Sequence, residues 1–359
     1  MIAGIGWELV TQAAALGGNP LPDFAIPTGP QHWKHQVRIC GGLYAALAED
    51  ACLKAGVQLR YYETPLSVEA SPAGGFRVRL AGKGMQAGIA ARTVVDCTGG
   101  ATVAGMLGLP RLREEVAQPG TLIYRLGGYD TAKLDLAALD AAAKAALLDG
   151  RLRSADYRHN LRGFLAGGGE NAMHVPGADS STSETHSRAN VDGRQSLLRM
   201  VRFLKAQSGF ERLRIERLQP ETGVRETYRI DGETRVTADD YTSGRVFPDA
   251  VAHAFYPVDL HDEKGIRPKH LAEGVVPTIP LGALIPRGSR DIIVAGRSIS
   301  SDRIANSGQR VQASSMAMGQ AAGAAAALAA KLGITPGRVP LADLRMVLAA
   351  HGAIVPPTP

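Results

Sequence analysis

The sequence predicts an α/β fold with two domains, and three features of the chain support this. A chain of 359 residues, 45% hydrophobic and 21% charged, can bury the cores of two globular domains. Several short runs with strand character lie between residues 66 and 97. A β-branched run, Ile292 to Ala295, turns sharply at Gly296-Arg297 and leads to an Ala/Gly-rich helix over 311–331. Both ends of the chain thus combine predicted strands with predicted helices, as α/β proteins do.

The amino-terminal part of the chain is expected to pair helices with a run of antiparallel strands. Apolar spacing predicts helices over 8–16 and 37–55, the second capped by Gly56, and then a strand over 57–62. Gly- and Pro-containing turns separate the runs that follow, which is typical of a β-meander. Its predicted strands are 66–70, 75–80, 85–90 and 92–97.

The middle of the chain has a different character, with longer helices and polar loops. The pattern predicts a strand over 121–126, a helix over 134–148, a strand over 163–166, a polar loop over 180–187 and a helix over 191–207. Proline-punctuated edge strands over 275–286 lead back to the carboxy-terminal part, where a closing helix is expected over 341–350.

The helix over 311–331 carries small residues on one face. Gly319 and Gly323 lie four apart and therefore share a face, where a flat group could approach closely. Its start offers free N–H groups and partial positive charge, which favour an anion or a polarised carbonyl. Tight packing against a sheet is the alternative explanation. The run does not predict a membrane span, because Ser314, Ser315 and Gln320 interrupt it.

The order of residues around this helix resembles the carboxy-terminal signature of a family of FAD-dependent oxidoreductases with the glutathione-reductase type of fold. The similarity covers residues 292–300, Arg310-Val311 and 316–323. A second segment, 96–100, is similar to the family's turn near FAD, although Gly100 stands where the family usually has an acid. The resemblance implies FAD as cofactor, and these binding residues: Asp96, Thr98, Gly99, Gly296, Arg297, Arg310, Val311, Gln312, Ala313 and Gly319.

The resemblance also implies a unit that the sequence does not show. A family member should open with a strand, a Gly-x-Gly-x-x-Gly turn and a helix, whereas Gly4-Ile5-Gly6 does not complete that fingerprint. The expected fold is therefore an incomplete Rossmann-like FAD-binding domain with an inserted β-meander and a second, α+β substrate domain. Residues 1–110 and 285–359 would form the FAD-binding domain, and 111–284 the substrate domain.

Two residues are candidates for catalysis. Arg225 lies in Gly223-Val224-Arg225-Glu226-Thr227, similar to a family block that approaches the flavin from the substrate domain, and could hold a carboxylate. A structural Arg225–Glu226 or Arg229–Glu233 ion pair is the alternative. His261 could serve as an acid or base, since its unperturbed pKa is near neutrality. It could equally be a hydrogen-bonded histidine at a strand end; His174, His253 and His270 have weaker claims.

The function expected from these features is hydride transfer between an unidentified organic substrate and FAD. The alternative is a truncated or non-catalytic flavoprotein-like chain that does not retain FAD on its own. Residues 188–229 contain nine arginines and one lysine against five acidic residues. Without interleaved aromatic residues, this excess of positive charge does not predict nucleic-acid binding. The three cysteines form no CxxC pair, which predicts neither a zinc site nor a disulfide framework. The amino-terminal residues do not resemble a signal peptide, and a cytoplasmic location is therefore expected. A homo-oligomer is left open.

Overall fold

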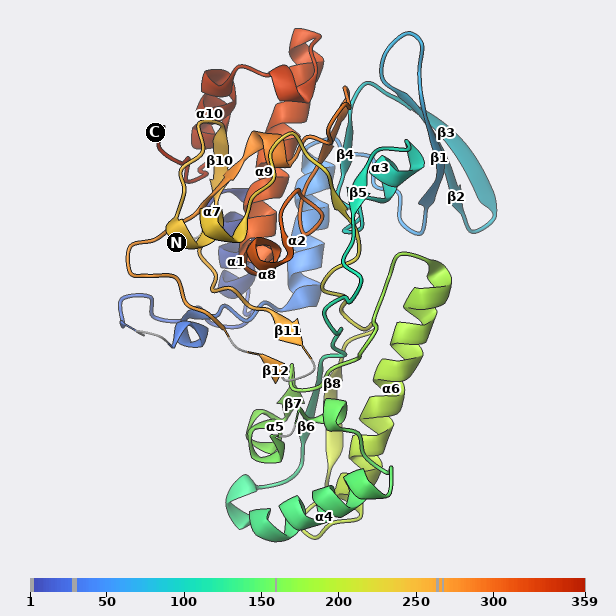
Figure 1. The fold of residues 1–359 in the computed structure, drawn as a ribbon, viewed down its shortest axis with the longest axis vertical. Coiled ribbons are helices and arrows are strands. Elements are labelled where there is room, and N and C mark those ends of the chain that lie inside the picture. Colours follow the sequence, from blue (N-terminus) through green and yellow to red (C-terminus); the bar gives the residue numbers. More distant parts are fainter. Residues whose placement is uncertain (1–2, 28–30, 159, 263–264, 267, 359) are drawn as a thin grey trace. The chain divides into compact units, whose positions relative to one another are not determined.

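The computed structural model describes residues 3–27, 31–158, 160–262, 265–266 and 268–358 (Figure 1). The chain divides into two compact units, which are described separately below. Unit 1 comprises Met1–Leu112, Arg229–Val258 and Lys269–Pro359, and unit 2 comprises Arg113–Tyr228 and Asp259–Pro268. Residues 229–258 and 269–284, expected in the substrate domain, thus fall in unit 1. The reason is that β10 (Ala250–His253) pairs with β13 (Thr278–Pro280) and packs against helix α9 (Gln312–Leu332).

Unit 1 is organised around a short parallel strand pair. Strand β14 (Ile292–Val294) pairs in parallel with β4 (Val94–Asp96), with Val294 opposite Asp96. All three residues of β14 are buried, and helix α9 packs against both strands. Because the two strands are parallel and in register, the loops that leave their carboxyl ends start side by side. Segments 198 residues apart in sequence therefore build one corner of unit 1.

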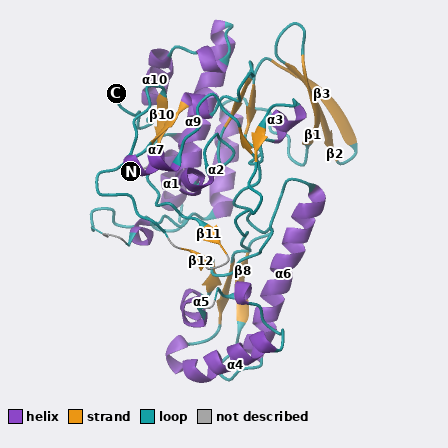
Figure 2. Ribbon diagram, in the orientation of Figure 1, coloured by secondary structure: helices purple, strands orange, loops and turns teal. Residues whose placement is uncertain are grey.

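The remaining elements of unit 1 surround this corner. Strands β1, β2 and β3 form a three-stranded antiparallel sheet in chain order, which Figure 2 shows as a separate ribbon. The expected fourth strand, β4, pairs with β14 instead. The other elements are α1 (Ile5–Ala15), α2 (Gly41–Lys54), β1 (Thr64–Ala70), β2 (Phe76–Gly82), β3 (Met85–Ala91), α3 (Thr102–Met106), β5 (Arg111–Leu112), β9 (Arg229–Ile230), α7 (Ala238–Ser243), α8 (Arg303–Gln309) and α10 (Leu341–Ala350), with 3₁₀ turns η1 (His32–His35), η4 (Leu281–Ala283) and η5 (Pro336–Arg338).

Helix α9 packs against α1 at a glycine of α1. A Cβ atom at Gly6 of α1 would lie 2.7 Å from the Met316 side chain, so only glycine fits there. At Gly319 and Gly323, by contrast, an added Cβ would meet no heavy atom within 4 Å. The small-residue face of α9 is therefore not needed for close packing at those two positions.

Unit 2 has its own hydrophobic core beneath a small antiparallel sheet. Strand β6 (Tyr124–Gly127) lies between β7 (Gly169–Glu170) and β8 (Arg214–Leu218). Long helix α6 (Ser183–Lys205) buries Leu197, Met200 and Leu204 in this core. The remaining elements are η2 (Thr131–Lys133), α4 (Leu136–Leu148), η3 (Ser154–Asp156), α5 (Leu161–Gly167), β11 (His261–Asp262) and β12 (Gly265–Ile266).

Three local predictions were wrong. Residues 163–166 belong to helix α5, because the Asn160 side chain caps it by accepting from Gly163 N at 2.9 Å. Helix α6 begins inside the expected loop 180–187, where Thr182 and Thr185 form a reciprocal cap. Residues 57–62 form no strand, and Tyr62 has φ 61° and is 95% exposed.

Candidate functional site

The turn after β4 is fixed by one buried carboxylate. Asp96 is 1% exposed, and its side chain accepts hydrogen bonds from Thr98 N at 3.0 Å and Thr98 Oγ1 at 2.7 Å. The same carboxylate accepts from Val103 N at 2.9 Å and Ala104 N at 3.2 Å, at the start of α3. Its oxygens are therefore engaged by the chain itself. Asp96 shapes the loop that displays the backbone of Gly99, which adopts φ 74°.

The turn after β14 meets the turn after β4 through Arg297. Arg297 Nε donates to Gly99 O at 2.7 Å, and Arg297 O accepts from Asn306 Nδ2 at 2.9 Å. Gly296 supplies the sharp corner with φ 87°. The structure thus brings together five of the residues predicted to bind a cofactor: Asp96, Thr98, Gly99, Gly296 and Arg297.

Positive charge gathers at this corner. Burial lowers the pKa of the Arg297 guanidinium, and the neighbouring charge of Arg310 lowers it further. Arg310 ends helix α8, and Val311 is the N-cap of α9 without a side-chain cap. The first N–H groups of α9, at Gln312 and Ala313, therefore point out of the helix next to Arg310. Two guanidinium groups and a helix start together favour a negatively charged ligand.

Buried polar side chains lie along the segment between the two arginines and just beyond it. Their backbone is held in place: Ser298 O accepts from Ile230 N at 2.9 Å, and Ser300 N donates to Ala283 O at 2.9 Å. Six of these side chains are at most 1% exposed. Within the described residues, each of the six has at least one Oγ or amide atom without a hydrogen-bond partner. Leaving such an atom unpaired costs about 1–3 kcal/mol. The set is Ser298, Ser300, Ser301, Asn306, Gln309 and Ser314, called here the buried polar segment.

Gly319 lies on α9 beyond this segment, where an added Cβ would meet no heavy atom within 4 Å. Its assignment as a binding residue stays a prediction.

In unit 2, the block 223–227 forms backbone hydrogen bonds with Thr121, and the Arg225 side chain points at neutral acceptors. Gly223 N donates to Thr121 O at 2.8 Å, and Thr121 N donates to Gly223 O at 3.0 Å. The Arg225 guanidinium donates to Pro119 O, to Thr121 Oγ1 at 2.9 Å and to Asn171 Oδ1 at 3.4 Å. These bonds fix the plane of the guanidinium group, as a residue that orients a ligand requires.

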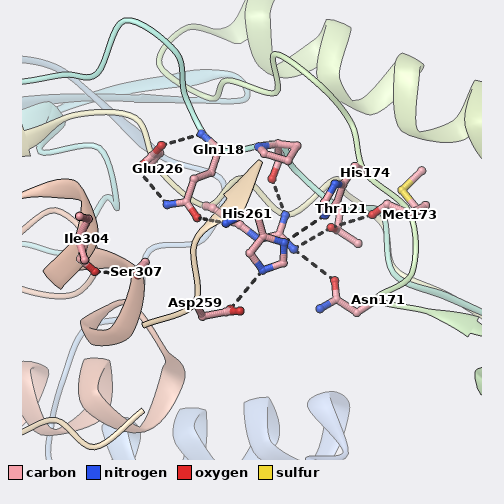
Figure 3. Close-up of polar contacts among 12 residues, drawn as sticks. Gln118, Thr121, Asn171, Met173, His174, Glu226, Asp259, His261, Ile304 and Ser307 are labelled. Atoms are coloured by element: carbon pink, nitrogen blue, oxygen red, sulfur yellow. Dashed lines mark hydrogen bonds and ion pairs between the residues drawn. The ribbon is translucent and has the colours of Figure 1, made fainter. Parts of the chain in front are cut away.

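The next residue of the block holds a buried amide. Glu226 is 2% exposed, and its carboxylate accepts from Gln118 N at 2.6 Å and from Gln118 Nε2 at 3.1 Å. Gln118 Oε1 in turn accepts from His261 N at 3.1 Å. Glu226 therefore positions the backbone of His261 through Gln118, as Figure 3 shows.

His261 lies at the centre of a second chain of contacts. Its Nδ1 lies 3.1 Å from His174 Nε2, and its Nε2 lies 3.2 Å from Asp259 Oδ2 (Figure 3). His261 is 1% exposed and His174 5% exposed. Burial lowers the pKa of His174 to about 3, with smaller contributions from His261, Arg225 and Arg158 and an opposing one from Asp259. His174 is therefore neutral at physiological pH.

Sequence reasoning ranked His174 low and did not single out Gln118 or Asp259. Asp259 and His261 are two residues apart, a spacing that puts side chains on one face of an extended segment, and this could have indicated the pair. Nothing local links His174 to His261, because 87 residues separate them.

Two further observations concern the described residues. They contain no group of three or more His, Cys, Asp or Glu side chains arranged to hold a metal ion. None of the helices in the described ranges is both long and apolar enough to cross a membrane.

Comparison with known proteins gives one result. Neither the curated proteins nor the solved structures contain a match to the chain. A family model described as "FAD dependent oxidoreductase" matches residues 1–348, which is nearly the whole sequence. The chain therefore belongs to the FAD-dependent oxidoreductase family, whose cofactor is FAD.

Proposed function

We propose that unit 1 binds FAD at the corner formed by β4 and β14, and that the protein transfers a hydride between an organic substrate and this flavin. The observation that supports the proposal is the buried polar segment, with Arg297 and Arg310 beside it. The ribityl hydroxyls, phosphates and ring carbonyls of FAD are the donors and acceptors that such serine, asparagine and glutamine side chains can pair with. The residues present thus fit the cofactor.

Each part of the corner has a distinct role in this proposal. Arg297 would steady phosphate or ribityl oxygens, since a planar guanidinium pairs well with phosphate. Residues 310–313 would face the isoalloxazine ring, with the start of α9 favouring negative charge there. Asp96 would act indirectly, by holding the loop that carries Thr98 and Gly99. The arrangement would be of the glutathione-reductase type, with β1–β3 as an insertion.

FAD, when bound, supplies the two-electron chemistry, and the protein supplies orientation and proton transfer. We assign the organic substrate to unit 2. Arg225 would position it, because its guanidinium plane is already fixed by Pro119, Thr121 and Asn171. His261 would take part in moving the proton that accompanies hydride transfer.

A substitution at Gln309 tests the cofactor assignment with two opposite readouts. Gln309 is fully buried, and both of its amide atoms lack a hydrogen-bond partner in the described structure. Gln309→Met keeps the volume and removes the unpaired atoms. Without FAD the variant should be as stable as the wild type or more stable, whereas its FAD affinity should fall about tenfold, the effect of one hydrogen bond of about 1.4 kcal/mol.

Thermal unfolding of the FAD-free protein and fluorescence titration with FAD measure the two effects. Gln219→Met, at an exposed position in unit 2, is the matched control and should change neither quantity. Loss of stability with unchanged FAD affinity would contradict the assignment. In unit 2, Arg225→Ala should slow flavin reduction by the substrate found in an anaerobic screen, with FAD content intact; an unchanged rate would remove Arg225 from the substrate site.

A further inference from the structure

Three side chains of unit 2 form a linear chain of proton-carrying atoms. Asp259 Oδ2, His261 Nε2, His261 Nδ1 and His174 Nε2 follow one another, joined by contacts of 3.2 and 3.1 Å. Both imidazoles are at most 5% exposed, so water does not compete freely for these contacts. Figure 3 shows the His261 ring between Asp259 and His174.

The order of these atoms determines where each proton lies. A carboxylate accepts but does not donate, so His261 must carry its proton on Nε2 to bond Asp259. In the neutral ring, His261 Nδ1 is then an acceptor, and His174 must donate from Nε2. A neutral His174 with its proton on Nε2 has a free lone pair on Nδ1. Among the described residues, no hydrogen bond engages that nitrogen.

The charges around the pair determine where an added proton is most stable. Arg225 and Arg158 raise the cost of positive charge on His174, whereas Asp259 lowers it and makes direct contact with His261. Arg158 is anchored by its Nε bond to Ala172 O at 3.0 Å and has φ 51°, a conformation that non-glycine residues rarely adopt. The backbone of His174 is fixed by its N–H bond to Ala155 O at 2.8 Å.

We propose that His174 is the group that exchanges a proton with the ligand of unit 2, and that His261 and Asp259 relay the proton and hold its charge. The ligand X–H bond breaks, its proton binds His174 Nδ1, and the Nε2 proton of His174 moves to His261 Nδ1. The positive charge then rests on His261 beside the Asp259 carboxylate. The electron pair of the X–H bond stays on the ligand, so nothing is oxidised or reduced in this step. Reversal of the same transfers protonates a ligand.

This inference rests on the proposed function only in taking the ligand of unit 2 to be the organic substrate. Within it, His261 is a positioning and relay residue, and His174 is the residue that meets the ligand. Sequence reasoning gave that role to His261, which is less exposed than His174.

Nitrogen-15 NMR of the histidine rings in the FAD-free protein tests the relay directly. At pH 7, His174 should be neutral with its proton on Nε2, and His261 should carry a proton on Nε2. On acidification, the first proton taken up by the pair should appear on His261. A His174 ring protonated on Nδ1 at pH 7, or a first proton that stays on His174, would overturn the proposal.

A conservative substitution separates the relay from a structural role. Asp259→Asn removes the charge and should shift the first protonation of the pair, and the acidic limb of the pH–rate profile, to lower pH by one unit or more. Asp262→Asn, the exposed neighbour on β11, is the matched control and should shift neither. An Asp259→Asn variant with unchanged protonation would refute the relay. If that variant does not fold, the wild-type ring spectra still decide, and failure to bind FAD would refute only the proposed function.

Discussion

Replacing Glu226 by glutamine should destabilise the protein measurably, although the two side chains have the same shape. The Glu226 carboxylate accepts two hydrogen bonds from Gln118, at 2.6 and 3.1 Å, and Gln118 Oε1 accepts from His261 N. The new amide can accept from Gln118 N, but its NH₂ group then faces the NH₂ group of Gln118. If Gln118 flips its amide instead, its NH₂ group faces His261 N–H.

In either arrangement two buried donor groups face each other without an acceptor between them, and one hydrogen bond of the network is lost. The expected loss is about 2–3 kcal/mol in the free energy of unfolding. Urea denaturation measures it as a lower midpoint at constant slope. Glu221→Gln is the matched control, because its side chain is 64% exposed, and it should cost less than about 0.5 kcal/mol.

A double variant sharpens the test. Gln118→Glu combined with Glu226→Gln moves the carboxylate to the other partner, where it can accept from both the new amide and His261 N. The backbone N–H of position 118 still has an acceptor, so the double variant should recover at least half of the lost stability. A single variant as stable as the wild type, or a double variant no better than the single, would refute this account of the site.

Two further predictions concern His174 and Asp96. The pKa of His174 is lowered to about 3 in the folded protein, whereas its unfolded value is near 6.5. Between these values the unfolded chain binds a proton that the folded protein does not. The free energy of unfolding therefore decreases as the pH is lowered, by up to about 1.4 kcal/mol per pH unit. His174→Leu should remove that component from urea midpoints measured between pH 5 and 7, and equal slopes in both proteins would contradict a buried neutral His174. Asp96→Asn should lower stability by about 2 kcal/mol and weaken FAD binding, because an amide cannot accept all four hydrogen bonds that Asp96 receives. Asp291→Asn, which meets β4 through its backbone carbonyl, is the control for thermal unfolding and FAD titration, and equal effects of the two substitutions would remove Asp96 from the loop-shaping role.

The corner of unit 1 was largely accessible from sequence, because each of its parts is local. A buried β-branched run, a glycine turn and a helix-forming stretch follow one another between Ile292 and Leu332, and each has its own signal. The pairing of β14 with β4 has no such signal. Short buried strands carry no pattern that selects a partner, and here the partner lies nearly 200 residues earlier in the chain.

Where local signals conflict, prediction failed for identifiable reasons. Residues 163–166 are a short apolar run that periodicity alone cannot assign, and the cap at Asn160 decides for helix. The helix start at Ser183 was hidden by a polar composition that also suits a loop, although its cap is a sequence signal. The proton chain in unit 2 was beyond reach, because His174 and His261 meet only through tertiary packing.

The parallel pairing of β4 with β14 also has a consequence for how the protein folds. It closes a loop of nearly 200 residues, and contacts of such long sequence separation form late, since the entropy of the intervening chain must be lost first. A flavin that requires both turns can bind only after that closure, and binding to the folded state alone adds to its stability. The appearance of bound flavin during refolding should therefore mark the last large step of assembly. Excess cofactor should restore the stability of variants in which the pairing of β4 with β14 is weakened.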